Sequence, residues 1–120
     1  MKPVTPIRLA AALALLPALA AAHAHLESAR PANGSTVQAA PAQAMLMFSE
    51  PVALNEVTLE KVGGKPEPLK NLPKDFSRHL MVTLPKLADG RYVLRYRGVS
   101  EDTHESKGSI SFAVGTKPKD

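Results

Sequence analysis

The sequence predicts an all-β fold, a β-sandwich of about seven strands in one domain, from three observations. Beyond residue 22, apolar residues alternate with polar ones in short runs separated by Pro, Gly, Asn and Asp, a pattern typical of successive strands. No amphipathic helix of useful length is indicated. A chain of 120 residues with 44% hydrophobic residues suits a single core. Many short strands in so small a chain indicate a sandwich or a barrel.

We expect the strands, in chain order, at residues 25–28, 36–38, 44–49, 57–62, 79–84, 91–100 and 107–114. Turn-forming residues separate them: Pro31 to Gly34 follows the first, Gly63-Gly64 follows the fourth, and Asp89-Gly90 precedes the sixth. Residues 65–77 contain three prolines, which discourage a central strand, so we expect a surface loop there.

The sixth expected strand is the most informative. Tyr92, Leu94 and Tyr96 share one face, because side chains two residues apart in a strand point the same way, so that face is expected to be buried. The preceding Asp89-Gly-Arg-Tyr92 resembles the tyrosine corner of immunoglobulin-like sandwiches.

The first 22 residues have the pattern of a cleaved secretory signal peptide. Lys2 and Arg8 give a positive start, and residues 9–22 are an almost unbroken run of Ala and Leu. A membrane-spanning helix requires about 20 apolar residues, so this run is too short for one. We therefore assign residues 1–22 to the signal, 23–115 to the sandwich and 116–120 to a polar tail, and we expect a secreted and soluble mature protein.

Two cleavage sites fit the small residues that signal cleavage requires, one before His23 and one before His25. Either cut makes histidine the first residue. A free α-amine and the imidazole of the same residue can chelate one metal ion, and such a nitrogen-rich clamp suits copper(II). After a cut before His23, His25 stands third from the amine, which is a second arrangement able to bind copper(II).

Composition narrows the function classes. The basic residues are scattered, and the chain has two Tyr and no Trp for stacking on bases, so nucleic-acid binding is not indicated. There is no cysteine, so a metal site would use His, carboxylate, Met or the amino terminus. Those ligands favour copper(II), nickel or zinc.

Asp102 and His104 are the most informative pair of candidate ligands. They stand two residues apart where the sixth strand gives way to a turn, and in an extended chain such residues project to the same side. Together with a histidine at the amino terminus, they would supply an amine, two imidazoles and a carboxylate. That set fills the tetragonal plane of nitrogen and oxygen ligands that copper(II) prefers. The alternative is that both residues simply decorate a hairpin.

Several motifs together resemble the CopC family of periplasmic copper-resistance proteins. They span nearly all of the expected mature chain: His23-Ala-His-Leu26 with Pro31-Ala-Asn-Gly34, Phe48-Ser-Glu-Pro51, Asp89-Gly-Arg-Tyr92, Val99-Ser-Glu-Asp-Thr-His104 and Gly108-Ser-Ile-Ser-Phe112. The resemblance implies a Greek-key, cupredoxin-like β-sandwich, in agreement with the strand pattern.

The resemblance also implies roles for individual residues. In the family, the first mature histidine binds copper(II) through amine and imidazole and an Asp-x-His pair completes the site, which here would be His23, Asp102 and His104. The spacing from His23 to Pro31 fits the family and favours cleavage after Ala22. Glu50 is similar to a carboxylate that supports the family's ligands, and His25 would lie beside the site or point to solvent.

The methionines depart from the family pattern. Some CopC proteins carry a second, methionine-rich copper(I) site in a loop, whereas Met45, Met47 and Met81 fall in expected strands. Met45 and Met47 share a strand face, and we expect them to pack in the core. His79 is expected on the surface and not as a ligand.

The sequence therefore favours a non-enzymatic copper(II)-binding protein for copper homeostasis or resistance. The resemblance implies a CopD-type inner-membrane partner. One alternative is a copper monooxygenase-like enzyme with an N-terminal histidine clamp, which would need an open coordination position. The other is a metal-free immunoglobulin-like interaction domain.

Overall fold

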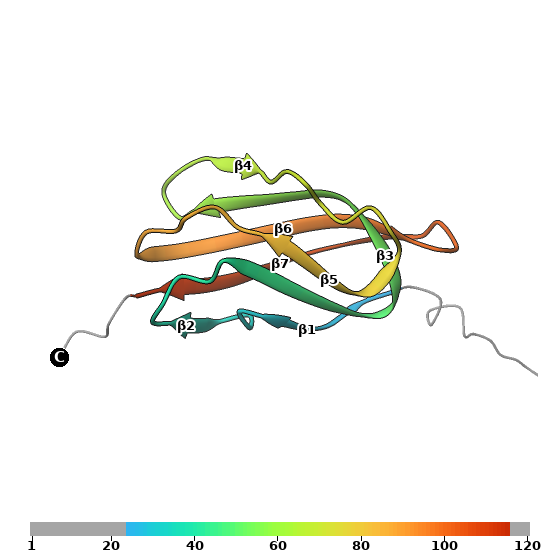
Figure 1. Ribbon diagram of the computed structural model, residues 1–120, viewed down its shortest axis with the longest axis horizontal. Coiled ribbons are helices and arrows are strands. Elements are labelled where there is room, and N and C mark those ends of the chain that lie inside the picture. Colours follow the sequence, from blue (N-terminus) through green and yellow to red (C-terminus); the bar gives the residue numbers. More distant parts are fainter. Residues whose placement is uncertain (1–23, 116–120) are drawn as a thin grey trace, which may run out of the picture.

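The computed structural model describes residues 24–115, which form seven strands and no helix (Figure 1). The strands are β1 (Leu26–Arg30), β2 (Ser35–Val37), β3 (Gln43–Lys61), β4 (Pro66–Pro68), β5 (Ser77–Thr83), β6 (Gly90–Ser100) and β7 (Glu105–Val114). The all-β prediction is confirmed. The predicted signal peptide, His23 and the predicted tail 116–120 lie outside the described residues, so those boundaries stay predictions.

All seven strands belong to one curled sheet. Its main order is β1-β3-β6-β7-β2, and β4 and β5 each pair with β3 as well. The pairs are antiparallel except for β2 and β7, which run parallel. The same strand, β3, thus has four neighbours, which requires it to be shared between two parts of the sheet.

The 19-residue strand β3 divides into two halves. Residues up to Phe48 pair with β1 and β5, Val52 at the bend pairs with both β5 and β6, and the residues after it pair with β6 and β4. Figure 1 shows β3 curving from one layer into the other between these halves. The sequence predicted two separate strands here, 44–49 and 57–62. The segment between them is instead part of the same strand, which bends from one layer into the other there. The two predicted strands therefore correspond to the two halves of β3.

Close approach of β6 to this bend requires a glycine. A Cβ atom on Gly98 would lie 2.7 Å from the Ala53 carbonyl oxygen and 2.8 Å from Val52 Cγ1. Any side chain would therefore push β6 away from β3 where the sheet turns.

The expected loop at residues 65–77 contains a short strand that the sequence did not predict. β4 pairs with the second half of β3 and lies off the main path of the sheet. Proline is tolerated in an edge strand because the N–H that it lacks can be one that would face solvent and not a neighbouring strand. The remaining five strands lie within one or two residues of their expected positions at most ends.

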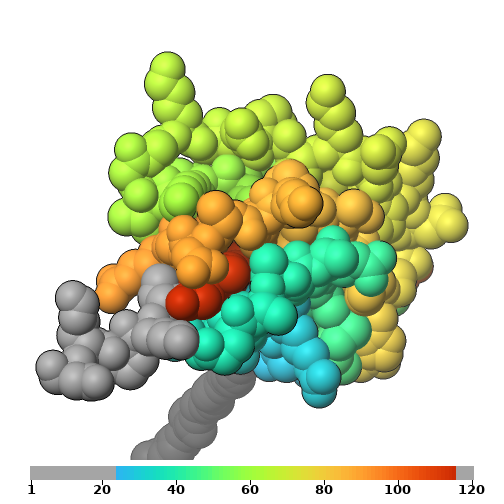
Figure 2. All heavy atoms as spheres, turned by 60° about the vertical axis from the view of Figure 1, so that its left-hand side comes forward, coloured from blue at the N-terminus to red at the C-terminus, as the bar shows by residue number. Residues whose placement is uncertain are grey.

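The core lies between the two layers. It is built from inward-facing residues of β3, β5, β6 and β7, among them Leu46 and Val82 in one layer and Leu94 and Val114 in the other. Phe48 meets the edge of the Tyr96 ring across the core, with ring centroids 5.4 Å apart. Figure 2 shows the end of the sandwich where β6 begins, with β1, the first half of β3 and β5 side by side in blue, green and gold at lower right.

Met45 and Met47 do not pack in this core, so that expectation is wrong. They alternate with the buried Ala44, Leu46 and Phe48, and they are half-buried on the outer face of the β1-β3-β5 layer. The two methionines do share one strand face, as predicted. The opposite face, with Ala44, Leu46 and Phe48, is also apolar, and it is this face that packs in the core.

The predicted tyrosine corner is present. The Tyr92 hydroxyl donates a hydrogen bond to the Ala88 carbonyl oxygen at 2.6 Å, and the Tyr92 ring stacks on Phe112. This contact fixes the turn that leads into β6 at the end of the sandwich opposite Ser100. Within residues 24–115 we find no helix of the length and apolarity that crossing a membrane requires.

Replacement of Tyr92 with Phe should lower the free energy of unfolding by about 1 kcal/mol, because one part-buried hydrogen bond is lost while the ring stacking is kept. Chemical denaturation of the two proteins measures the difference. An unchanged midpoint and slope would show that the hydroxyl contributes nothing to stability.

Candidate metal centre

The loop between β6 and β7 is short and held by its own backbone. The Ser100 N–H donates to the His104 carbonyl oxygen at 3.0 Å, and the Thr103 N–H donates to the Ser100 carbonyl oxygen at 2.9 Å. Thr103 takes the left-handed conformation, with a φ of 68°. Pairing of Val99 with Glu105 closes the strands on either side. The backbone therefore presents Asp102 and His104 in a defined geometry at the tip of the hairpin.

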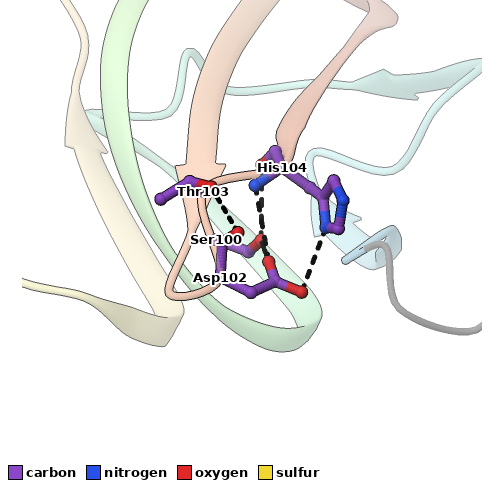
Figure 3. A network of polar contacts seen from close by, with 4 residues as sticks. All are labelled: Ser100, Asp102, Thr103 and His104. Atoms are coloured by element: carbon purple, nitrogen blue, oxygen red, sulfur yellow. Dashed lines mark hydrogen bonds and ion pairs between the residues drawn. The ribbon is translucent and has the colours of Figure 1, made fainter.

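Asp102 and His104 lie in direct contact (Figure 3). The distance from Asp102 Oδ2 to His104 Nδ1 is 3.0 Å, and each side chain is about half exposed. Two ligand atoms at a right angle around a metal, each about 2.0 Å from it, stand about 2.8 Å apart. The observed separation is thus close to what one ion would require of a neighbouring oxygen and nitrogen.

The other oxygen of Asp102 is held by the loop. Asp102 Oδ1 accepts a hydrogen bond from the Ser100 hydroxyl, and the His104 N–H lies 3.4 Å from the same oxygen (Figure 3). Ser100 is itself buried, with 2% of its surface exposed, so its hydroxyl is a fixed donor. This leaves Oδ2 on the side of the imidazole.

These hydrogen bonds lower the pKa of Asp102 to about 2, from an ordinary value of 3.8. Donation from the Ser100 hydroxyl is the largest cause, and the contact with His104 is the next. The carboxylate therefore carries its negative charge across the whole neutral and mildly acidic range. An anionic oxygen beside an imidazole is a chemically suitable half of a copper(II), nickel or zinc site.

The start of the described chain is anchored beside this hairpin. The Ser106 hydroxyl donates to the Ala24 carbonyl oxygen at 3.0 Å, and both residues are buried. His25 is tied to β3, because its N–H donates to Ser49 Oγ at 3.0 Å and its carbonyl oxygen accepts from the Ser49 N–H at 2.9 Å. Ala24 is thus fixed next to a residue only two positions after His104.

The remaining predicted site residues are placed as follows. The exposed His25 ring contacts Ser49, with Nδ1 and Oγ 3.3 Å apart. Glu50 is exposed on β3, next to the bend, and none of the described contacts joins it to Asp102 or His104. His23 lies outside the described residues. Of the five predicted site residues, the structure therefore brings Asp102 and His104 together.

Sequence reasoning did not assign a positioning role to Ser100 or Ser106. The signal that could have found them was their place in the strand pattern, since both fall on an inward strand face whose other residues are mostly apolar. A buried hydroxyl requires a partner, and here the partners are Asp102 and the Ala24 carbonyl oxygen.

Within residues 24–115, no three His, Cys, Asp or Glu side chains gather closely enough to hold a metal ion. Asp102 and His104 are therefore a pair of candidate ligands and not a complete ligand set. A complete site of this kind requires at least one more ligand from elsewhere.

Comparison with known proteins places this geometry in a family. Residues 26–115 match the model of the CopC domain, which is most of the chain. The chain belongs to the CopC family. A CopC relative, copper resistance protein C of Xanthomonas campestris pv. juglandis, is 39% identical over 120 residues, covering 92% of each chain. Protein YobA of Escherichia coli is 37% identical over 98 residues, covering 78% of this chain and 79% of its own.

Solved CopC structures share the fold. The crystal structure of CopC from Methylosinus trichosporium has a TM-score of 0.69 at 25% identity and covers 81% of this chain and 98% of its own. PcoC from Escherichia coli, described as a methionine-rich copper resistance protein, has a TM-score of 0.57 at 30% identity and covers 78% and 99%. The predicted cupredoxin-like sandwich and the predicted family are therefore confirmed, and membership in a copper-resistance family is established.

Replacement of Ser100 with Ala should raise the Asp102 pKa from about 2 toward 3.8, because the strongest hydrogen bond to the carboxylate is removed. A carboxylate whose pKa is depressed on folding stabilises the protein above its unfolded pKa, and this contribution is lost as the pH falls toward about 2. Carbon-detected NMR titration of the Asp102 carboxyl measures the shift. An unchanged pKa in the variant would show that His104 alone holds the carboxylate charged.

Proposed function

We propose that this protein binds copper(II) in the periplasm and buffers it or delivers it to a membrane partner. The observation that carries the proposal is the buried hydrogen bond from Ser106 to the Ala24 carbonyl oxygen, 3.0 Å long. It holds the beginning of the sandwich domain against the strand that follows His104. This contact supports a ligand set drawn from both parts of the chain.

The proposed ligands are the amine and imidazole of His23, the Asp102 carboxylate and the His104 imidazole. His23 is covalently bonded to Ala24, whose carbonyl oxygen Ser106 anchors, and this supports the inclusion of His23 in the set. Cleavage after Ala22 would make the His23 nitrogen a free amine. Together with the 3.0 Å Asp102–His104 pair, this supplies three nitrogens and one oxygen, the set that a tetragonal copper(II) ion prefers.

The charge of the site supports a divalent ion. Asp102 is anionic at any pH well above about 2, so protons do not compete for it near neutrality. Nitrogen ligands in general bind a metal ion only in their deprotonated forms, so metal binding releases protons. Copper affinity should consequently fall as the pH drops from 8 to 5, and this fall would report on the nitrogen ligands.

His25 and Glu50 are proposed to support the site without binding the metal. His25 uses its backbone on Ser49, and this anchors the chain immediately after Ala24. Glu50 stands exposed one residue further along β3, so its carboxylate brings one negative charge close to the Ser49 anchor.

Carriage is proposed in preference to oxidation chemistry. Catalysis with oxygen requires an open position on the copper, and a carboxylate ligand from Asp102 would occupy one. The names of the CopC relatives, which describe copper resistance, fit the same proposal. Residues 1–22 would serve as the export signal, and residues 23–115 as the working domain, with a CopD-type inner-membrane protein as the recipient or source of copper.

Replacement of Asp102 with Asn should weaken copper(II) binding by about 10- to 100-fold or more, because the only anionic ligand becomes neutral. Competition against a chromophoric copper(II) chelator measures the affinity of the processed protein. The matched control is Asp89→Asn, which makes the same chemical change in the exposed turn before β6, at the far end of that strand from Ser100. Equal affinities in the two variants would exclude Asp102 from the ligand set.

Electron paramagnetic resonance of copper(II)-loaded protein should separate the His23 clamp from a site built on His25. Under the proposal, His104→Ala removes one nitrogen from the spectrum and His25→Ala removes none. Mass spectrometry first establishes which residue begins the processed chain. Loss of a nitrogen in the His25 variant, with none lost in the His104 variant, would favour the three-residue N-terminal arrangement instead.

A further inference from the structure

The outer face of the β1-β3-β5 layer carries a cluster of sulfur and imidazole side chains that the copper(II) proposal does not use. Strand register places Met45 opposite Met81 and Met47 opposite His79. In all four positions the side chain points away from the core, because the intervening residues Leu46 and Leu80 are buried.

The register makes these four side chains a compact group. Directly opposite residues in an antiparallel pair have Cβ atoms about 4.5–5.5 Å apart, and residues two apart on one strand lie about 7 Å apart. Met and His side chains are long enough to converge over such a rectangle. We name these four residues, Met45, Met47, Met81 and His79, the methionine face.

The methionine face is accessible to solvent. Met81 is 44% exposed, an unusual position for so large an apolar side chain, and His79 is exposed as well. Met45 and Met47 are half-buried. The Ser28 hydroxyl of β1 donates to Met47 Sδ at 3.3 Å, on the side of β3 away from His79, so this sulfur exchanges the Ser28 contact for a metal bond when it binds an ion with His79.

The chemistry of the methionine face suits a soft monovalent metal ion. Thioether sulfur and imidazole are the ligands that copper(I) selects among the side chains present in a chain without cysteine. The four side chains include no carboxylate, and Arg30 stands opposite Met45 on β1. A divalent hard ion would therefore gain no anionic ligand and would meet a positive neighbour, which costs more for a double charge than for a single one.

We propose that the methionine face is a second metal site, specific for copper(I), formed by the thioethers of Met45, Met47 and Met81 and the imidazole of His79. It lies in strands and not in a loop, and no residue of the proposed copper(II) site takes part in it. Ser49, which anchors His25, is the next outward position after Met47 on β3. The two sites thus occupy neighbouring stretches of the same strand.

Methionine-methyl NMR of the exported, processed protein tests this proposal, with silver(I) as a redox-inert probe for copper(I). The chain has four methionines, and removal of the signal with Met1 leaves the three of the methionine face. All three methyl resonances should shift together and saturate at one equivalent of silver(I). The same titration with copper(I) under reducing, anaerobic conditions should give the same end point.

Three variants assign the ligands. Met81→Leu and His79→Ala should each weaken silver(I) binding about tenfold or more, measured by competition with a chromophoric chelator. His104→Ala makes the same change as His79→Ala on the hairpin, and it should leave the silver(I) affinity as it is. All three positions are exposed, and circular dichroism checks that each variant folds.

The outcomes distinguish this site from the copper(II) site. Methyl shifts that saturate at different silver(I) concentrations, or unchanged affinity in either Met81→Leu or His79→Ala, would overturn the methionine face as a site. A loss of silver(I) affinity in His104→Ala would show that the soft ion binds at the hairpin instead, and would overturn it too. Since the copper(II) measurements use Asp102 and His104 variants, each proposal can fail while the other stands.

Discussion

The bend in β3 is the constraint on which the rest of the structure depends. Because one strand pairs with β1 and β5 before the bend and with β6 and β4 after it, both layers of the sandwich are fixed to each other through a continuous backbone. Gly98 permits the close approach of β6 that this requires. The hairpin that follows β6 and the chain that enters β1 therefore emerge at the same end of the domain.

At that end, backbone and hydroxyl groups orient the charged side chains. Ser100 and Ser106 occupy inward strand positions and direct their hydrogen bonds outward, to the Asp102 carboxylate and to the Ala24 carbonyl oxygen. Buried donors are less free to rotate or to exchange with water than exposed ones, so they hold their partners in place. The Asp102–His104 contact is exposed and would be weak by itself, but a rigid loop preserves its geometry.

Alternating polarity and turn residues were sufficient to predict the all-β class, six of the strand positions and the tyrosine corner, because these depend on local pattern. The continuity of β3 could not be predicted, since a bend between two apolar runs looks like a loop in sequence. Nor could β4, whose prolines are acceptable only at an edge. Asp102 and His104 were identified from spacing, whereas the outward position of Met45 and Met47 depends on which of two apolar faces meets the opposite layer.

The Ser106–Ala24 hydrogen bond joins residues 82 positions apart, one just before the first strand and one in the last strand of the domain. Under the proposed ligand set, no copper(II) site can exist until β7 has been added to the sheet. In an unfolded chain, binding of one ion by His23 and His104 would first require closure of a loop of about 80 residues, which costs conformational entropy. Copper(II) binding would then indicate that folding is complete. At a free copper(II) concentration 100 times the dissociation constant, binding would stabilise the folded domain by about 2.7 kcal/mol.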